Sequence, residues 1–228
     1  AVSGGEAGVA VTNDPELLDR MLLLGHFGRI THGEGSRTFD HLGDMGLGTK
    51  YRAHPFAIAM ALETLRILPK LNAGRTRCYA IFNDALRAID GVEVIDPRED
   101  TQRGGYLEFK FKVARAVADR CDMDLLEKAF QAEGAPITRD RYSTTNFTYG
   151  LIHRSPLFTT FDRRSLGGCF YDPVTYPGPP VEPPSLPVTE DVCTRLFGCY
   201  AFVDVEEAFL LQMAGAVRKV MANLGRLR

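Results

Sequence analysis

Residues 26–48 hold the densest gathering of chemically reactive side chains in this 228-residue chain. Imidazoles and carboxylates can together ligate a metal ion, and this segment contains three of each: His26, His32, His41, Glu34, Asp40 and Asp44. Metal-binding helices place ligands three or four positions apart, but no His-x-x-x-His or Glu-x-x-His pair occurs here. The run 33–36 also lacks the Gly-Lys-Ser/Thr ending of a phosphate loop. We therefore predict a long loop without a metal, of the kind that often serves function.

The elements on either side of this loop must position it. Val9 and Val11 alternate with small residues and predict a strand. Asn13 or Asp14 then caps a helix that begins near Pro15 and ends at Gly25.

A second helix is predicted over residues 56–68, opened by Pro55. Its apolar residues lie nearly all round, so we expect it to be buried on more than one side, against its own sheet or a partner subunit. Pro69 is expected to bend or interrupt it before an amphipathic helix resumes towards Gly91. His54 precedes Pro55; it has the chemistry of a base, but its position favours a structural role at the helix start.

The pattern of apolar and polar residues changes after Gly91. Residues 92–95 and 106–113 alternate as half-buried strands do, and residues 122–133 form a helix stopped by Gly134. The proline-rich run 172–187 predicts an extended, irregular loop. Helices are expected around residues 189–196 and 205–224. This mixture indicates a small α+β domain, with its boundary inside the helix near residues 70–80.

Composition narrows the classes of protein. The net charge is −2, from 27 basic and 29 acidic residues, and no basic run marks a nucleic-acid surface. No apolar run approaches the ~18 residues that a membrane span needs, and the N-terminal residues lack signal-peptide features. We therefore expect a cytoplasmic protein that binds neither nucleic acid nor membrane. The five scattered cysteines contain no CxxC pair, which argues against a disulfide framework and a zinc site.

Four separated blocks carry motifs in a defined order. They are the turn and strand at 4–14, the helix end and glycine loop at 22–29, the segment at 47–61 that contains Lys50-Tyr51-Arg52, and a tail with matches at 153–158, 186–190 and 216–220. Together they resemble the DegT/DnrJ/EryC1/StrS family of pyridoxal-phosphate (PLP)-dependent sugar aminotransferases. In that family a lysine, a few small residues and a Gly-Glu-Gly-Gly-type turn precede a strand and a Thr-Asn-Asp helix start.

The resemblance implies an α/β architecture, the type I fold of PLP-dependent transferases. Residues 1–75 would complete the large PLP-binding domain, and residues 76–228 would form the small C-terminal α+β domain. The lysine that holds the cofactor as a Schiff base would fall immediately before Ala1, so we expect no catalytic residue within the chain itself. The family's pyridine-nitrogen aspartate, ring-stacking aromatic residue and most phosphate ligands lie upstream of that lysine.

The resemblance also implies roles for four residues. Lys50 replaces an asparagine that, in most family members, crosses the dimer interface to the neighbour's cofactor phosphate; a solvated surface lysine is the alternative. Arg52 would clamp a donor carboxylate or a sugar diphosphate, or else pair with an acid of the preceding loop. Tyr142 and His153 would face the acceptor pocket and hydrogen-bond its hydroxyl groups, although each type of residue is commonly structural.

The activity that the resemblance implies is the transfer of an amino group from glutamate or glutamine to a keto sugar or cyclitol ketone, with pyridoxal 5'-phosphate as cofactor. The protein would be a homodimer with active sites at the subunit interface. Two alternatives keep the fold. A histidine in place of the lysine marks relatives that dehydrate sugars, and a member without the pyridine-nitrogen aspartate would be a regulatory or assembly subunit.

Overall fold

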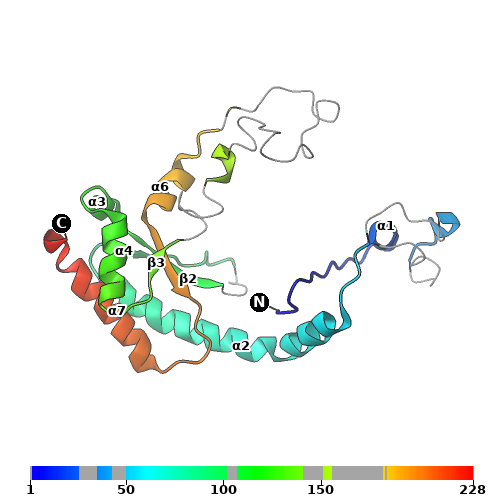
Figure 1. Ribbon diagram of the computed structural model, residues 1–228, viewed down its shortest axis with the longest axis horizontal. Coiled ribbons are helices and arrows are strands. Elements are labelled where there is room, and N and C mark those ends of the chain that lie inside the picture. The colour runs from blue at the N-terminus through cyan, green and yellow to red at the C-terminus, as the bar shows by residue number, and fades with distance from the viewer. Residues whose placement is uncertain are drawn as a thin grey trace. The chain divides into compact units, whose positions relative to one another are not determined.

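The computed structural model describes residues 2–25, 35–42, 50–101, 107–140, 151–155, 182 and 184–227. The chain divides into two compact units, Ala1–Lys70 and Leu71–Arg228, and the division falls inside helix α2 (Pro55–Arg87). Figure 1 labels the α-helices and the strands β2 and β3, with numbers that follow the chain. The assignment of residues 1–75 and 76–228 to the large and small domains of a transferase stays a prediction.

The first unit begins with an extended segment and helix α1 (Pro15–Gly25). Asp14 caps the helix as predicted, because its Oδ1 accepts hydrogen bonds from the backbone N–H groups of Glu16 at 2.9 Å and Leu17 at 3.2 Å. The predicted strand through Val9 and Val11 is wrong, since these residues are unpaired coil and 81% and 88% exposed. A strand requires a hydrogen-bonded neighbour, and the described residues of this unit include no other strand.

Part of the glycine-rich segment is anchored on α1 by a buried carboxylate. Asp19 is 2% exposed and accepts hydrogen bonds from the backbone N–H and the hydroxyl of Ser36, at 3.0 and 2.7 Å. A Cβ on Gly35 would lie 1.6 Å from Oδ1 of Asp19, so only glycine fits there. The short 3-10 helix η2 (Asp40–Leu42) follows. The backbone N–H and the hydroxyl of Ser36 are therefore both used in binding the carboxylate of Asp19.

Helix α2 is one helix of 33 residues, so of the two effects predicted for Pro69, a bend or an interruption, the interruption is wrong. Proline removes one backbone hydrogen bond and crowds the preceding turn, a penalty of about 3 kcal/mol. The C-terminal half of the helix offsets this by burying Cys78, Phe82 and Leu86 in the core of the second unit.

The second unit is built on an antiparallel sheet of order β1-β2-β4-β3. Its strands are β1 (Val92–Val94), β2 (Glu108–Val113), β3 (Thr138–Arg139) and β4 (Leu196–Tyr200). The alternation predicted for β2 is confirmed: Phe109, Phe111 and Val113 are buried, while the residues between them are partly exposed. Strand β4 lies where the sequence predicted the end of a helix followed by loop.

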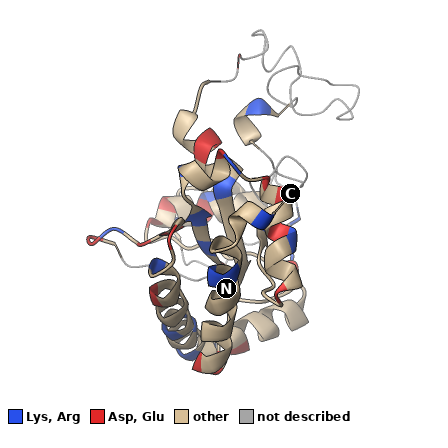
Figure 2. Cartoon of the chain, turned by 90° about the vertical axis from the view of Figure 1, so that its left-hand side faces the viewer, with Lys and Arg blue, Asp and Glu red and all other residues tan. Residues whose placement is uncertain are grey.

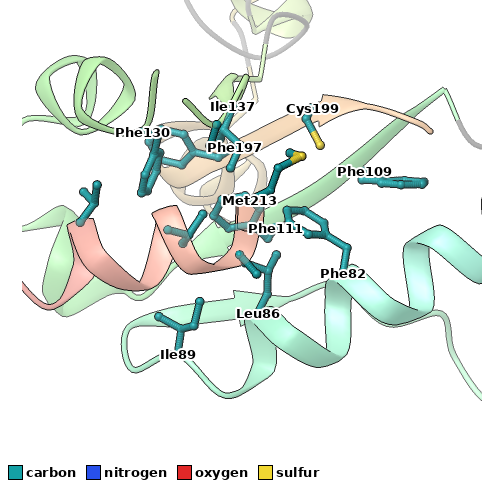
Figure 3. Close-up of a cluster of buried hydrophobic side chains, with 14 of the residues drawn as sticks. Phe82, Leu86, Ile89, Phe109, Phe111, Phe130, Ile137, Phe197, Cys199 and Met213 are labelled. Atoms are coloured by element: carbon teal, nitrogen blue, oxygen red, sulfur yellow. The ribbon is translucent and has the colours of Figure 1, made fainter. Parts of the chain in front are cut away.

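Helices complete this unit. They are α3 (Arg115–Ala118), α4 (Met123–Ala132), α6 (Pro187–Arg195) and α7 (Glu207–Met221), with the 3-10 turns η3 (Ile152–Arg154) and η4 (Leu224–Arg226). In Figure 3, side chains from α2, the sheet and α7, such as Phe82, Phe111 and Met213, point towards one another. Aromatic edge contacts join Phe130 of α4 to Phe111 and Phe197. This core makes unit 2 a compact α+β assembly.

The N-terminal half of α2 carries apolar side chains that the described residues leave exposed: Phe56, Ile58, Met60, Leu62, Leu65 and Ile67, all between 47% and 76% exposed. The prediction that this helix is buried on more than one side is therefore not confirmed within the described part of unit 1. A group of exposed apolar side chains of this kind is typical of a surface that another part of a protein or a partner covers. Its covering by other parts of a complete protein or by a partner stays a prediction.

Produced as residues 1–228 alone, the chain is expected to bind an apolar dye such as ANS through this helix. Replacing Ile58, Leu62 and Leu65 together by glutamate should lower the dye fluorescence at least about twofold, because these three residues share one helix face. Val188→Glu, at an exposed apolar residue of the other unit, is the control and should change little. Equal fluorescence from all three proteins would contradict the prediction.

Candidate functional site

The turn at the start of the chain is docked on α2. Gly4 is buried, and a Cβ there would lie 2.9 Å from the carbonyl oxygen of Ala57 and 3.2 Å from Cβ of Ala61. Gly5 has φ of +64°, a conformation that favours glycine. The hydroxyl of Thr64 donates mainly to the carbonyl of Met60 in its own helix, at 2.8 Å, and also lies 3.3 Å from the carbonyl oxygen of Ser3. The two glycines thus let this segment lie close against the helix.

Lys50 and Arg52 lie on the short segment that leads into α2. The backbone N–H of Tyr51 donates to the carbonyl of Gly25 at 2.8 Å, which ties this segment to the end of α1. Lys50 and Arg52 are both exposed, and Arg52 also interacts with another residue of the protein. An ammonium and a guanidinium two positions apart form a group suited to phosphate and carboxylate anions.

His54 has the structural role that its position favoured. Its Nδ1 accepts a hydrogen bond from the backbone N–H of Phe56 at 3.2 Å, and so satisfies one of the unpaired donors at the start of α2. This contact fixes the direction in which the segment carrying Lys50 and Arg52 enters the helix.

His153 belongs to a cluster in the second unit that the sequence did not reveal. Its Nε2 lies 3.2 Å from Oε1 of Glu190, and its side chain is 11% exposed. The guanidinium of Arg154 reaches the other carboxylate oxygen at 2.7 Å. Glu190 therefore joins η3 to helix α6, although His153 and Glu190 are 37 positions apart.

Glu190 also caps its own helix. Its Oε1 accepts from the backbone N–H of Leu186 at 3.3 Å, at the N-terminal end of α6. The pKa of Glu190 is lowered, first by the hydrogen bond with His153 and then by the N–H of Leu186, with Arg154 contributing further. The carboxylate is therefore held in its ionised form.

The residues expected at the site fall in both units. Lys50 and Arg52 lie together on unit 1, and His153 lies in unit 2 beside Glu190. Tyr142, His26 and His32 lie outside the described residues. Glu190 is the residue that the sequence analysis missed as a partner; its one local signal was a glutamate in the first turn of a helix, which is typical of capping.

Comparison with known proteins decides the family. The sequence model of the DegT/DnrJ/EryC1/StrS aminotransferase family matches residues 1–164, well over half of the chain. The chain belongs to this family.

Solved structures agree with the family in fold. DesI, determined in the presence of its TDP-sugar product, is 22% identical, with 95% of this chain and 45% of that one covered, at a TM-score of 0.62. A family aminotransferase from Brucella abortus is 22% identical, with 93% and 45% covered, at 0.57. The E. coli GDP-4-keto-6-deoxy-D-mannose-3-dehydratase, with bound hydrated PLP, is 15% identical, with 91% and 49% covered, at 0.61.

These likenesses show the fold of the DegT/DnrJ/EryC1/StrS family's PLP-dependent enzymes, as the sequence predicted. The chain spans about half the length of the solved structures that it matches. Among the described residues no group of three His, Cys, Asp or Glu side chains is placed to hold a metal ion. No helix in the described part combines the length and apolarity that crossing a membrane requires.

Proposed function

We propose that the complete protein is a PLP-dependent aminotransferase that moves an amino group from glutamate or glutamine onto a keto sugar or cyclitol ketone. The observation that carries this proposal is the family match over residues 1–164, which includes the Gly4-Gly5 turn and the segment of Lys50 and Arg52. The cofactor-bearing lysine would lie immediately before Ala1 in the complete protein.

The described residues fit the cofactor's phosphate group in their chemistry. Lys50 and Arg52 are exposed cations held ahead of the first turn of α2, where helix N–H groups also favour an anion. Lys50 would bind the phosphate as a point charge, in the place of the family's usual asparagine. When bound, PLP supplies the electron sink that amino transfer requires.

The chain's own residues would then bind and orient the substrates. The planar guanidinium of Arg52 suits the carboxylate of the amino donor or the diphosphate of a nucleotide sugar, since both accept paired hydrogen bonds. His153 would hydrogen-bond a hydroxyl group of the acceptor, and Tyr142 would do the same. The docked turn at Gly4 would hold the lysine-bearing segment against α2.

We further propose that the protein works as a homodimer in the cytoplasm, with each active site shared between subunits. The exposed apolar half of α2 supports this assembly, because a helix apolar all round needs a partner on more than one side.

The full-length protein tests the proposal. Incubated with PLP it should develop the visible absorbance of protein-bound cofactor, and with glutamate or glutamine it should aminate at least one member of a panel of keto sugars and inososes. Mass spectrometry of the products provides the measurement. A flat spectrum would exclude both the transferase and the dehydratase, and would leave the non-catalytic subunit.

A sugar dehydratase is the second candidate, and the fold match to the E. coli 3-dehydratase favours it. The same assay separates the two, because dehydration yields a product that has lost water and gained no nitrogen. The residue immediately before Ala1 in the complete protein should be histidine in that case and lysine in the case of amino transfer.

A further inference from the structure

The contact between His153 and Glu190 restricts the position of the imidazole proton. An ionised carboxylate can only accept hydrogen bonds, so the 3.2 Å contact requires a proton on Nε2 of His153. In a neutral imidazole the other nitrogen, Nδ1, then carries a lone pair and acts as an acceptor. The lowered pKa of Glu190 supports the ionised form of the carboxylate.

The surroundings of the carboxylate make this arrangement stiff. Arg154 binds Oε2 at 2.7 Å, while Leu186 N–H and His153 share Oε1. With both oxygens engaged by donors from η3 and the start of α6, the carboxylate has a fixed orientation. The imidazole that it binds is 11% exposed and therefore has little freedom to turn.

We propose that Glu190 is the positioning residue for His153: it keeps the proton on Nε2 and so presents Nδ1 as a hydrogen-bond acceptor for a hydroxyl group of the acceptor sugar or cyclitol. The inference rests on the proposed function for the identity of the hydroxyl compound. The placement of the proton rests on the His153–Glu190 contact alone.

The decisive variant in the full-length protein is Glu190→Gln. Glutamine has the same shape but offers one oxygen and one NH2 group in place of two acceptors. With its oxygen towards Leu186 and Nε2, its NH2 group faces the guanidinium of Arg154; turned over, the NH2 group donates to Nε2 and the bond to Leu186 is lost. Nitrogen-15 NMR near pH 8, with His153→Gln for assignment, should show mainly Nε2-protonated imidazole in the unaltered protein. Glu190→Gln should give a mixture of tautomers.

Steady-state kinetics provide the second readout. Losing one oriented hydrogen bond should raise KM for the keto acceptor about 3- to 10-fold in Glu190→Gln, while KM for the amino donor stays within about twofold. Glu207→Gln, an exposed glutamate in the first turn of α7, is the matched control and should change neither quantity. Glu190→Ala should also lower the melting temperature, because it removes the cap.

Each possible outcome of these experiments leads to a different conclusion. An unchanged tautomer in Glu190→Gln overturns the positioning role. A mixed tautomer with unchanged acceptor KM overturns the hydroxyl contact. If no ketone is aminated by the unaltered protein, the proposed function and the hydroxyl contact fall together, while the NMR result still decides the role of Glu190.

Discussion

Replacing Arg195 by alanine is expected to lower the free energy of unfolding by about 2–3 kcal/mol. Arg195 is 8% exposed at the end of α6, and one guanidinium nitrogen donates both to Glu93 at 2.8 Å and to the carbonyl of Val113 at 2.9 Å. Its Nε donates to Asp191 at 2.9 Å. Truncation leaves the buried carbonyl unpaired, which typically destabilises by about 1–3 kcal/mol.

The two carboxylates limit the size of this effect. Glu93 and Asp191 are 40% and 31% exposed, so water can solvate them once the arginine is gone. The loss should therefore fall below the 3–5 kcal/mol typical of a fully buried pair. Figure 2 shows basic and acidic residues interspersed over the elements, and Arg195 is unusual among the described arginines in being buried.

Lowering the pH should reduce the difference in the free energy of unfolding between Arg195→Ala and the unaltered protein. Hydrogen bonds from Arg195 are the first cause of the lowered pKa of both Glu93 and Asp191. A lowered carboxyl pKa contributes stability that is present above the unfolded value of about 4 and is lost as the pH falls through the folded value. The variant lacks that contribution, so the two unfolding curves should approach each other on acidification.

Urea unfolding followed by circular dichroism at pH 7 and at acidic pH measures both effects. The control is Arg98→Ala, because Arg98 is 78% exposed and pairs with Asp100 on the surface. It should change the free energy of unfolding by less than about 0.5 kcal/mol. A similar small change for Arg195→Ala would show that the buried cluster contributes no net stability.

The sequence predicted the local features of the fold well. Asp14 caps α1 as predicted, by accepting from backbone N–H groups two and three positions further along the chain, so the signal lies within one turn. Asp122, which was predicted as the first residue of its helix, caps α4 in the same way. The strand pattern of β2 likewise reflects a single buried face. Such features depend on a residue and its immediate neighbours.

The missed features depend on partners distant in sequence. Strand β4 follows α6 without a turn, and it exists because Phe197 pairs with Phe111 and Arg139 on either side. Gly198 breaks its apolar pattern, yet a Cβ there would lie 3.0 Å from the carbonyl of Phe109. The pairing of His153 with Glu190 is equally non-local. Periodicity in one segment carries no information about either partner.

Replacing Lys50 tests the proposed shared site with the largest expected effect. In the full-length protein, Lys50→Ala should weaken PLP binding about 10- to 100-fold, since a hydrogen bond to a charged group contributes about 1.5–3 kcal/mol. A second variant, in which the proposed cofactor-bearing lysine is replaced by alanine, should be inactive. Lys70→Ala, at an exposed lysine within α2, is the control and should bind PLP normally.

Lys50 could contact the cofactor phosphate in the neighbouring subunit or the one in its own subunit. Differently tagged copies of the two variants, co-expressed and purified as the heterodimer, distinguish these two arrangements. If Lys50 reaches the neighbour's phosphate, one of the two sites combines an intact lysine with an intact Lys50, and the heterodimer should show about half of the unaltered dimer's activity at limiting PLP. If Lys50 serves its own subunit, both sites are defective and the heterodimer should be nearly inactive. Normal PLP binding by Lys50→Ala itself would identify Lys50 as a solvated surface residue, because a phosphate ligand cannot be removed without weakening the cofactor's attachment.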